Sequence, residues 1–379
     1  MNDKISSFDE EATLSGLIKK ARRRTIWRNT GISLAVTLLI LGGGWFTNLQ
    51  LQYRSSDNTL RDIEMFKKIS GPNLYRSGSK IKYGFLRGTL EYQTYKLVAG
   101  IPVIWDQETY EFSSWGSFSR PHYSDLSLLD PVMQEEGFHY YRPFNPYNGE
   151  REMMFYLPAV KYENYLNEIP QLNDMDERKL VELALSFDRN YTLEQIKAML
   201  PSDVHPVWYW VDTYSDMKPY IAHKMPDESI VNPFPDPASR VYGFGVQHDY
   251  NDISEKDFLE AVESGLRTNG KYKQEYKRIY DYMRNNKEQP DTSDVRLLGV
   301  VVTGTADKLK SLQGQPYVRA AVLARLLTGT EQQTQTISLK FKLESQDCCC
   351  PIGIKKVSTF IPSFGNLQGL VVYSPLSPV

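Results

Sequence analysis

The stretch NTGISLAVTLLILGGGWFTNLQLQY, Asn29 to Tyr53, contains no Asp, Glu, Lys or Arg. A helix needs about 20 mostly apolar residues to cross the hydrocarbon core of a bilayer. We therefore predict a single transmembrane helix over residues 29–53. A cleaved signal peptide is the alternative, but its apolar part is usually about 7–15 residues long and ends in small residues. Bulky Trp45 and Phe46 follow the glycine triplet here, which favours an uncleaved anchor.

The two flanks of this stretch differ in charge. On its C-terminal side, Arg54 and Arg61 are the only nearby cations. Basic residues are enriched on the cytoplasmic side of membrane proteins, so the asymmetry predicts a cytoplasmic N-terminus. The bulk of the chain then lies outside the cell membrane, which it crosses once. The basic residues that determine this topology are Lys19, Lys20, Arg22, Arg23, Arg24 and Arg28.

Residues 1–28 form a short cytoplasmic segment whose pattern predicts one short helix. Ser7 and Glu10 have the spacing of a capping box. Several apolar residues recur at helical spacing and form one stripe. The stripe suits either a helix on the membrane surface or a helix that docks in a groove of a cytoplasmic partner. The docking hypothesis assigns partner binding to Phe8, Leu14, Leu17 and Ile18.

Composition argues against several classes of protein. The net charge of −2 gives no reason to expect direct binding to nucleic acid. The three cysteines, Cys348–Cys350, are consecutive and do not have the spacing of metal ligands. No cysteine precedes them, so the large exterior region has no disulfide framework. Such a region is large enough to fold on its own hydrophobic core.

Sequence motifs for catalysis are missing or incomplete. Gly265–Lys271 resembles a phosphate loop, but Tyr272 stands where Ser or Thr would hold the metal. No two of the five histidines have the helical spacing of a ligand pair. Asp188 and Asp212 flank one strand–helix–strand unit, where loop carboxylates are commoner than a catalytic acid pair. We predict that the protein is not an enzyme and binds no cofactor or metal.

The sequence of the exterior region predicts an α+β fold. Residues 55–68 suggest a juxtamembrane linker or helix. Within the strand-rich region 54–150, strands dominate residues 80–112, and residues 113–150 suggest a long loop region over a sheet. Residues 151–323 contain two strand–helix–strand units, which predict an α+β sandwich of the ferredoxin-like type. Residues 324–379 are atypical and predict a disordered tail or an out-of-frame end of the gene.

Six motifs resemble the sigma factor regulator family of Gram-positive bacteria, in the family's order. They are Gly71–Tyr75, Leu90–Lys96, Gly100–Trp105, Ser186–Thr192, Trp208–Tyr214 and Gly299–Thr305. The resemblance covers roughly residues 22–323, as an N-terminal-like region up to residue 150 and a C-terminal-like domain over 151–323. The chain departs from the family after about Leu323.

This resemblance implies a membrane anti-sigma factor. Members hold an extracytoplasmic-function (ECF) sigma factor inactive at the membrane until envelope stress, often beside a second small membrane protein. A short cytoplasmic helix, a single transmembrane span and a large exterior domain fit that layout. The alternative is a membrane-anchored exterior protein that binds cell-envelope material and has no sigma partner. Deleting residues 2–18 separates the two, because only an anti-sigma factor would then release sigma-dependent transcription.

Overall fold

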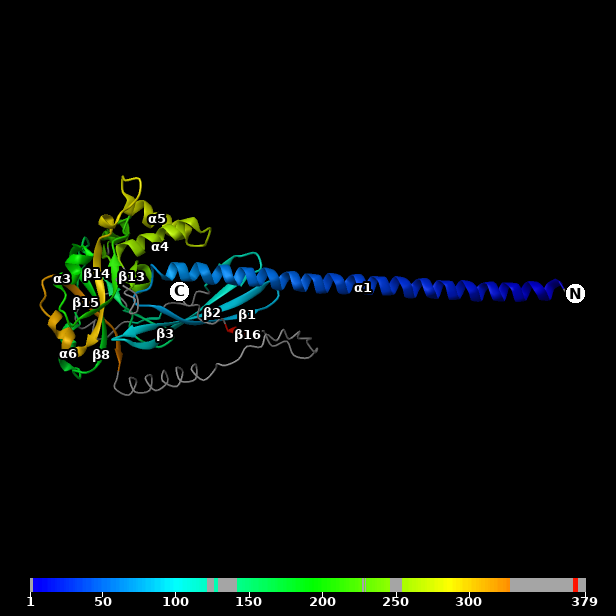
Figure 1. Cartoon of the computed structure of the whole chain (residues 1–379), viewed down its shortest axis with the longest axis horizontal. Coiled ribbons are helices and arrows are strands. Elements are labelled where there is room, and N and C mark those ends of the chain that lie inside the picture. Colours follow the sequence, from blue (N-terminus) through cyan, green and yellow to red (C-terminus); the bar gives the residue numbers. More distant parts are fainter. Residues whose placement is uncertain are drawn as a thin grey trace, which may run out of the picture.

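One helix forms the whole N-terminal part of the described structure. The computed structural model describes residues 3–120, 126–128, 142–226, 228, 230–245, 254–327 and 371–373. Helix α1, Asp3–Lys67, runs without interruption through the basic segment and the apolar stretch. Its N-terminal half projects as a long arm from a compact body of sheets and helices (Figure 1).

This continuity corrects the predicted separate short helix over residues 1–28, and of the two alternatives for residues 55–68 it confirms the helix, up to Lys67. The 65 residues of α1 include both segments and the apolar stretch between them. The chain has no proline before Pro72, so nothing removes a helical hydrogen bond. Gly42–Gly44 weaken the helix by about 1 kcal/mol each in water. In an apolar environment, however, the backbone has no other partner for its hydrogen bonds, which favours an unbroken helix.

The strand-rich half forms one antiparallel sheet under the C-terminal end of α1. Its strands follow the order β16-β1-β2-β3-β4. Side chains on β2 alternate between exposed and buried, as expected for a sheet with one covered face. Ile63 of α1 packs there against Leu90, Tyr92 and Phe112. The bounds are β1 Tyr75–Tyr83, β2 Arg87–Val98, β3 Ile101–Ser113, β4 Phe118–Ser119 and β16 Val371–Tyr373.

The C-terminal half contains the two predicted strand–helix–strand units. They are β8 Leu180–Tyr191, α3 Leu193–Met199 and β9 His205–Val211, then β14 Leu297–Thr305, α6 Ala306–Leu309 and β15 Val318–Leu327. The sheet order is β13-β9-β14-β8-β15, and all pairs are antiparallel. Strand β14 therefore lies between the parallel strands β8 and β9, which confirms the ferredoxin-like arrangement. The α+β class is confirmed as well.

Both faces of this second sheet are covered. One face packs against α3, α4, α5 and α6, through side chains such as Ile196, Phe258 and Ile279. The other face packs against residues 153–166 and buries Trp208 and Trp210. These two tryptophans belong to the core and do not form a surface patch.

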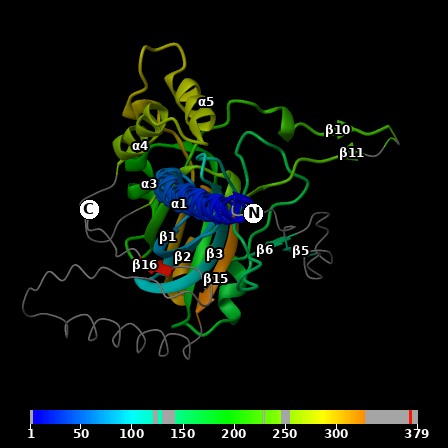
Figure 2. The same cartoon turned by 90° about the vertical axis from the view of Figure 1, so that its right-hand side faces the viewer.

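A long insertion between β9 and β14 supplies two charged helices, α4 and α5. Viewed along α1, helices α4 and α5 lie on one side of it and β1–β3 lie on the other (Figure 2). Insertion elements are β10 His223–Lys224, β11 Ile230–Val231, β12 Asp236–Pro237, β13 Gly243–Gly245, α4 Glu255–Arg267 and α5 Lys273–Arg284. Before β8 come β5 Leu126–Leu128, β6 Arg142–Phe144 and β7 Met154–Phe155. Short 3-10 helices span Ile169–Asp174, Lys218–Tyr220, Ala238–Arg240, Thr292–Asp294 and Lys310–Leu312.

Candidate functional site

The predicted partner-binding residues lie at the free end of α1. Leu17 and Ile18 are 61% and 58% exposed, far more than apolar residues in a packed interface. Phe8 and Leu14 fall in a part of α1 whose side chains lie outside the described residues. The arm that carries them extends away from both sheets (Figure 1). Leu17 and Ile18 are therefore available to a partner.

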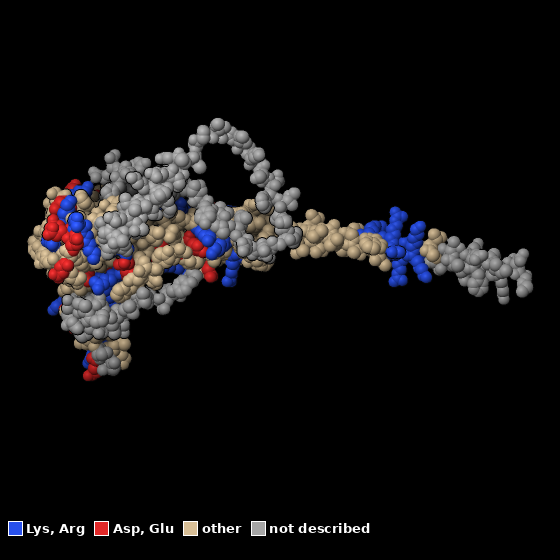
Figure 3. Space-filling view, turned by 90° about the horizontal axis from the view of Figure 1, so that it is seen from below, with Lys and Arg blue, Asp and Glu red and all other residues tan. Residues whose placement is uncertain are grey.

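The predicted topology residues form a belt of positive charge beside this end. The belt surrounds α1, and an uncharged surface follows it toward the body (Figure 3). All six are exposed: Lys19, Lys20, Arg22, Arg23, Arg24 and Arg28. The span Gly16–Lys67 contains a window of mean hydropathy 1.6, of which only 6% is buried. A core helix of a soluble protein would be mostly buried, so α1 has the length and exposure of a membrane-crossing helix.

Polar side chains fasten α1 to the first sheet where the apolar stretch ends. Asn48 and Gln52 both donate to the carbonyl of Gly84, at 3.2 and 2.6 Å. The Asn48 Oδ1 atom accepts from the amide of Leu86 and the hydroxyl of Ser114, each at 3.0 Å. Asn48 and Gln52 are almost fully buried. The last turns of the predicted span, 29–53, therefore contact the β1–β2 turn, and residues 29–47 remain available to lipid.

Further along, α1 docks on the turn between α4 and α5. The Asp62 carboxylate accepts a hydrogen bond from the amide of Lys271 at 2.7 Å. Burial raises the pKa of Asp62 above its usual 3.8, although this hydrogen bond and nearby cations act to lower it. The ring of Phe66 stacks on Tyr272, with centroids 3.9 Å apart and planes at 5°. A Cβ atom on Gly270 would lie 2.0 Å from Asp62 Oδ1, so the turn approaches α1 closely.

The last turn of α1 is held by ion pairs with the first sheet. Lys67 Nζ lies 2.8 Å from Glu108 Oε1, and Glu64 pairs with Arg76. Burial acts to raise the pKa of the Glu108 carboxyl. The charges of Lys67 and Arg120 outweigh it and lower that pKa below its ordinary value of 4.5. Glu108 is consequently ionised where it anchors the helix.

A buried charged cluster joins the two sheets. Lys96 Nζ on β2 lies 2.9 Å from Glu182 Oε2 on β8, and their side chains are 3% and 0% exposed. The amide of Asn73 donates to Glu182 Oε1 at 2.6 Å. Lys96 also lies 3.8 Å above the ring of Trp105. The two sheets thus share a specific, buried polar contact.

The contacts of Asn48, Asp62 and Lys96 with the rest of the fold are not among the features predicted from the sequence. The signal was present, because Lys96 occupies a buried position of an alternating strand and Glu182 interrupts the apolar run of β8. A lone charge in an apolar pattern predicts a partner. It does not predict which one, since Lys96 and Glu182 are 86 residues apart.

The residues considered for other chemistry are scattered. Gly265–Lys271 connects two helices and does not follow a strand, as a phosphate loop would. Asp188 accepts from the hydroxyl of Tyr191, and Asp212 accepts from Asn190. Within the described ranges, no group of three or more His, Cys, Asp or Glu is placed to hold a metal ion. Residues outside those ranges are His122, His139, His248 and Cys348–Cys350.

Comparison with known families matches part of α1, much of the first sheet and nearly all of the second sheet. A model described as sigma factor regulator N-terminal matches residues 15–103. A model described as sigma factor regulator C-terminal matches residues 172–324. Together they cover well over half of the chain, in the order that the motifs indicate. Neither the curated proteins nor the solved structures gave a match.

Proposed function

Because the chain belongs to the sigma factor regulator family, we propose that it is a single-pass membrane anti-sigma factor. In this proposal its N-terminal segment holds an ECF sigma factor at the cytoplasmic face of the cell membrane. An envelope signal then reaches the exterior sheets and ends the repression. Membership of the family supports a sigma factor as the partner. The ECF class of that sigma factor, the orientation of the chain in the membrane and the envelope signal are further parts of this proposal. A second small membrane protein can assist, as in other members.

The observation that carries the proposal is the exposed apolar end of α1. Leu17 and Ile18 face no described part of the chain, yet the N-terminal family model begins at residue 15 and includes them. An amphipathic helix that lacks a partner within its own chain suits a groove on another protein. A segment of this size can bind a partner but is too small to hold an enzyme site.

Continuity of α1 supports a direct route for the signal. One helix carries the partner-binding end and the contacts of Asn48, Asp62 and Phe66 with the exterior elements. A shift of those elements moves the helix as a unit, because an uninterrupted helix has no hinge. We propose that release follows such a displacement, with or without subsequent proteolysis.

Capture of the sigma factor by the N-terminal segment tests the assignment. Full-length chain in detergent micelles should capture the sigma factor encoded beside its gene. Leu17→Asp combined with Ile18→Asp should abolish capture, because two charges would enter an apolar interface. Unchanged capture by this double variant would refute the assigned surface.

A matched control adds the same charges elsewhere on the helix. Ala12→Asp combined with Gly16→Asp places two carboxylates one turn apart on the helix face opposite the apolar stripe. This control should retain capture. Equal loss in both variants would mean that added charge, and not the stripe, governs binding.

Deletion of residues 2–18 separates an anti-sigma factor from an exterior binding protein. The truncated chain keeps its basic belt and its apolar stretch, so its insertion is preserved. Sigma-dependent transcription in cells should rise several-fold. A flat transcript level, with the truncated chain present in the membrane, would favour the exterior binding protein.

A further inference from the structure

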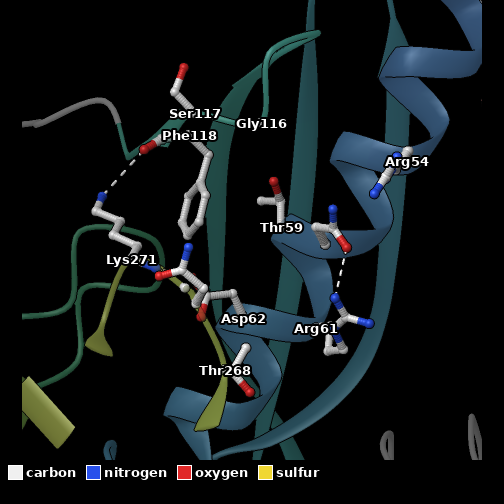
Figure 4. A pocket seen from close by; sticks show the side chains of 12 residues that line it. Arg54, Thr59, Arg61, Asp62, Gly116, Ser117, Phe118, Thr268 and Lys271 are labelled. Carbon is white, nitrogen blue, oxygen red and sulfur yellow. Dashed lines mark hydrogen bonds between the residues drawn. The ribbon is translucent and has the colours of Figure 1, made fainter. Parts of the chain in front are cut away.

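A cavity of about 560 Å³ lies where α1 meets the exterior elements, and the function proposed above does not use it. Its walls come from three separate parts of the chain: α1, the β3–β4 turn and the α4–α5 turn (Figure 4). Volumes of about 300–1,000 Å³ are typical of sites for small molecules. The lining residues are Arg54, Asn58, Thr59, Arg61, Asp62, Gly116–Phe118 and Thr268–Lys271.

Charge on the lining is predominantly positive. Arg54, Arg61 and Lys271 are exposed, and none of them forms an ion pair with a carboxylate of the described residues. Arg61 donates only to the side chain of Asn58, at 2.7 Å. In the view of Figure 4, Arg54 and Arg61 lie on one side and Lys271 on the other.

The single acidic residue in the lining does not balance these cations. The Asp62 carboxylate is 6% exposed and already accepts the backbone N–H of Lys271. Within the cavity lining, Asp62 therefore holds the α4–α5 turn against α1. Arg54 and Arg61 keep their donors available for an anion from outside.

A buried hydroxyl in the same lining has no partner. Thr59 is 1% exposed, and its Oγ1 makes no hydrogen bond within the described structure. A buried polar atom without a partner is unfavourable, so most such atoms in folded proteins are satisfied. An anion in the cavity is a natural acceptor for this hydroxyl.

We infer that this cavity binds a ligand that carries a phosphate group. Arginine pairs with phosphate through two parallel hydrogen bonds, and lysine adds a point charge. Arg54 and Arg61 are about 10 Å apart along the helix, at a rise of 1.5 Å per residue. The cavity therefore suits an organic phosphate better than the free ion.

The position of the cavity suggests two sources for that phosphate. Arg54 directly follows the uncharged stretch, which places this end of the cavity beside the membrane surface in the proposed topology. A phospholipid headgroup can reach it from there, and a soluble phosphate ester can reach it from solvent. Either ligand would bridge α1 and the α4–α5 turn, and so would affect how firmly the helix is held.

Binding is tested on the full chain in nanodiscs, without a sigma factor. In nanodiscs of digalactosyldiacylglycerol, a bilayer lipid without phosphate, sn-glycerol 3-phosphate is titrated by calorimetry. In nanodiscs that contain phosphatidylglycerol, hydrogen exchange of residues 268–271 is compared with that in pure digalactosyldiacylglycerol. Saturable calorimetric binding identifies a soluble ester. Protection that appears only with phosphatidylglycerol identifies the headgroup.

Substitutions decide whether the cavity is responsible. Arg54→Gln, Arg61→Gln and Lys271→Gln together should weaken binding at least about tenfold, since charge-assisted hydrogen bonds are lost. The matched control removes three exposed cations elsewhere and should leave binding unchanged. Its substitutions are Arg178→Gln, Lys256→Gln and Lys277→Gln.

Thr59→Val separates a ligand contact from a structural one. Removal of an unpartnered buried hydroxyl should raise the melting temperature of the unliganded chain while it weakens binding of the same probe. No binding in either nanodisc, or equal loss in the cavity variant and its control, would overturn the inference. Neither result would bear on the sigma factor partner, which is absent from the assay.

Discussion

At the residue scale, a buried ion pair between Lys96 and Glu182 joins the two sheets. Lys96 and Glu182 leave water completely, and each has the other as its main compensation. Such an ion pair adds little to the free energy of unfolding compared with an apolar pair of similar volume. Removing only one of its partners, however, lowers that free energy strongly. Asn73 and Trp105 add a hydrogen bond and a cation–π contact to the same cluster. The cluster therefore specifies how the sheets meet more than it adds stability.

Loss of one charge at this contact should be severe. Lys96→Met should lower the free energy of unfolding by about 3–5 kcal/mol, because the Glu182 carboxylate would stay buried without a cation. Urea unfolding of the full chain in detergent micelles, followed by tryptophan fluorescence, measures the change. Lys96→Met with Glu182→Leu should recover part of this loss. A double variant as unstable as the sum of its single variants would contradict the coupling.

Glu108 should make stability depend on pH in the acid range. Its pKa in the folded chain is lower than the ordinary 4.5, so its ionised form stabilises the fold at neutral pH. That contribution is present above about pH 4.5 and is lost as the pH falls through the folded pKa. Glu108→Gln should therefore lower the free energy of unfolding by about 2 kcal/mol at pH 7.

The same variant supplies its own control at low pH. As the pH falls through the lowered pKa of the folded chain, the wild-type carboxyl also becomes protonated, so the difference between the two chains should shrink. Chemical unfolding at a series of pH values between 3 and 7 follows it. A difference that stays constant over this range would show that the charge of Glu108 is not the cause.

Among the elements, α1 shows what a sequence pattern can and cannot predict. Charge and apolar content were sufficient to predict a helix over the apolar stretch, and local patterns also predicted the two strand–helix–strand units. Local strand patterns predicted β2 and β3. The contacts of Asn48 and Asp62 were not predictable, because they join positions 38 and 209 residues apart. Propensity is local, whereas docking depends on the folded arrangement.

The close approach of α1 to the α4–α5 turn should not tolerate a larger residue. Gly270→Ala places a methyl group where Asp62 Oδ1 lies, so the carboxylate must leave the amide of Lys271. We expect a loss of about 1–3 kcal/mol, as for other overpacked sites, and faster hydrogen exchange of the Lys271 amide. Gly78→Ala, which meets no atom within 4 Å, is the matched control and should be nearly neutral. Slow exchange in the Gly270→Ala chain would argue against this docking.

At the scale of the whole molecule, one continuous helix connects an exposed N-terminal end to the folded body. The exposed end of α1 presents Leu17 and Ile18, and the other end is fixed to both sheets. The resemblance to a family, rather than composition, predicted what these regions do. The division of the chain into a basic end, an uncharged stretch and a folded body was predicted from charge and hydropathy, because such an uncharged stretch is typical of a membrane-crossing helix.

The proposed orientation makes opposite ends of the chain accessible from opposite sides of the membrane. Gly16→Cys should resist a membrane-impermeant maleimide in intact cells, whereas Trp115→Cys, at a position that is 75% exposed, should be labelled. Both are made in a background with Cys348–Cys350 changed to serine, so that only the introduced thiol reacts. Permeabilised cells should label both variants equally. Labelling of Gly16→Cys before permeabilisation would reverse the topology, and it would place the apolar stripe on the side where no sigma factor is found.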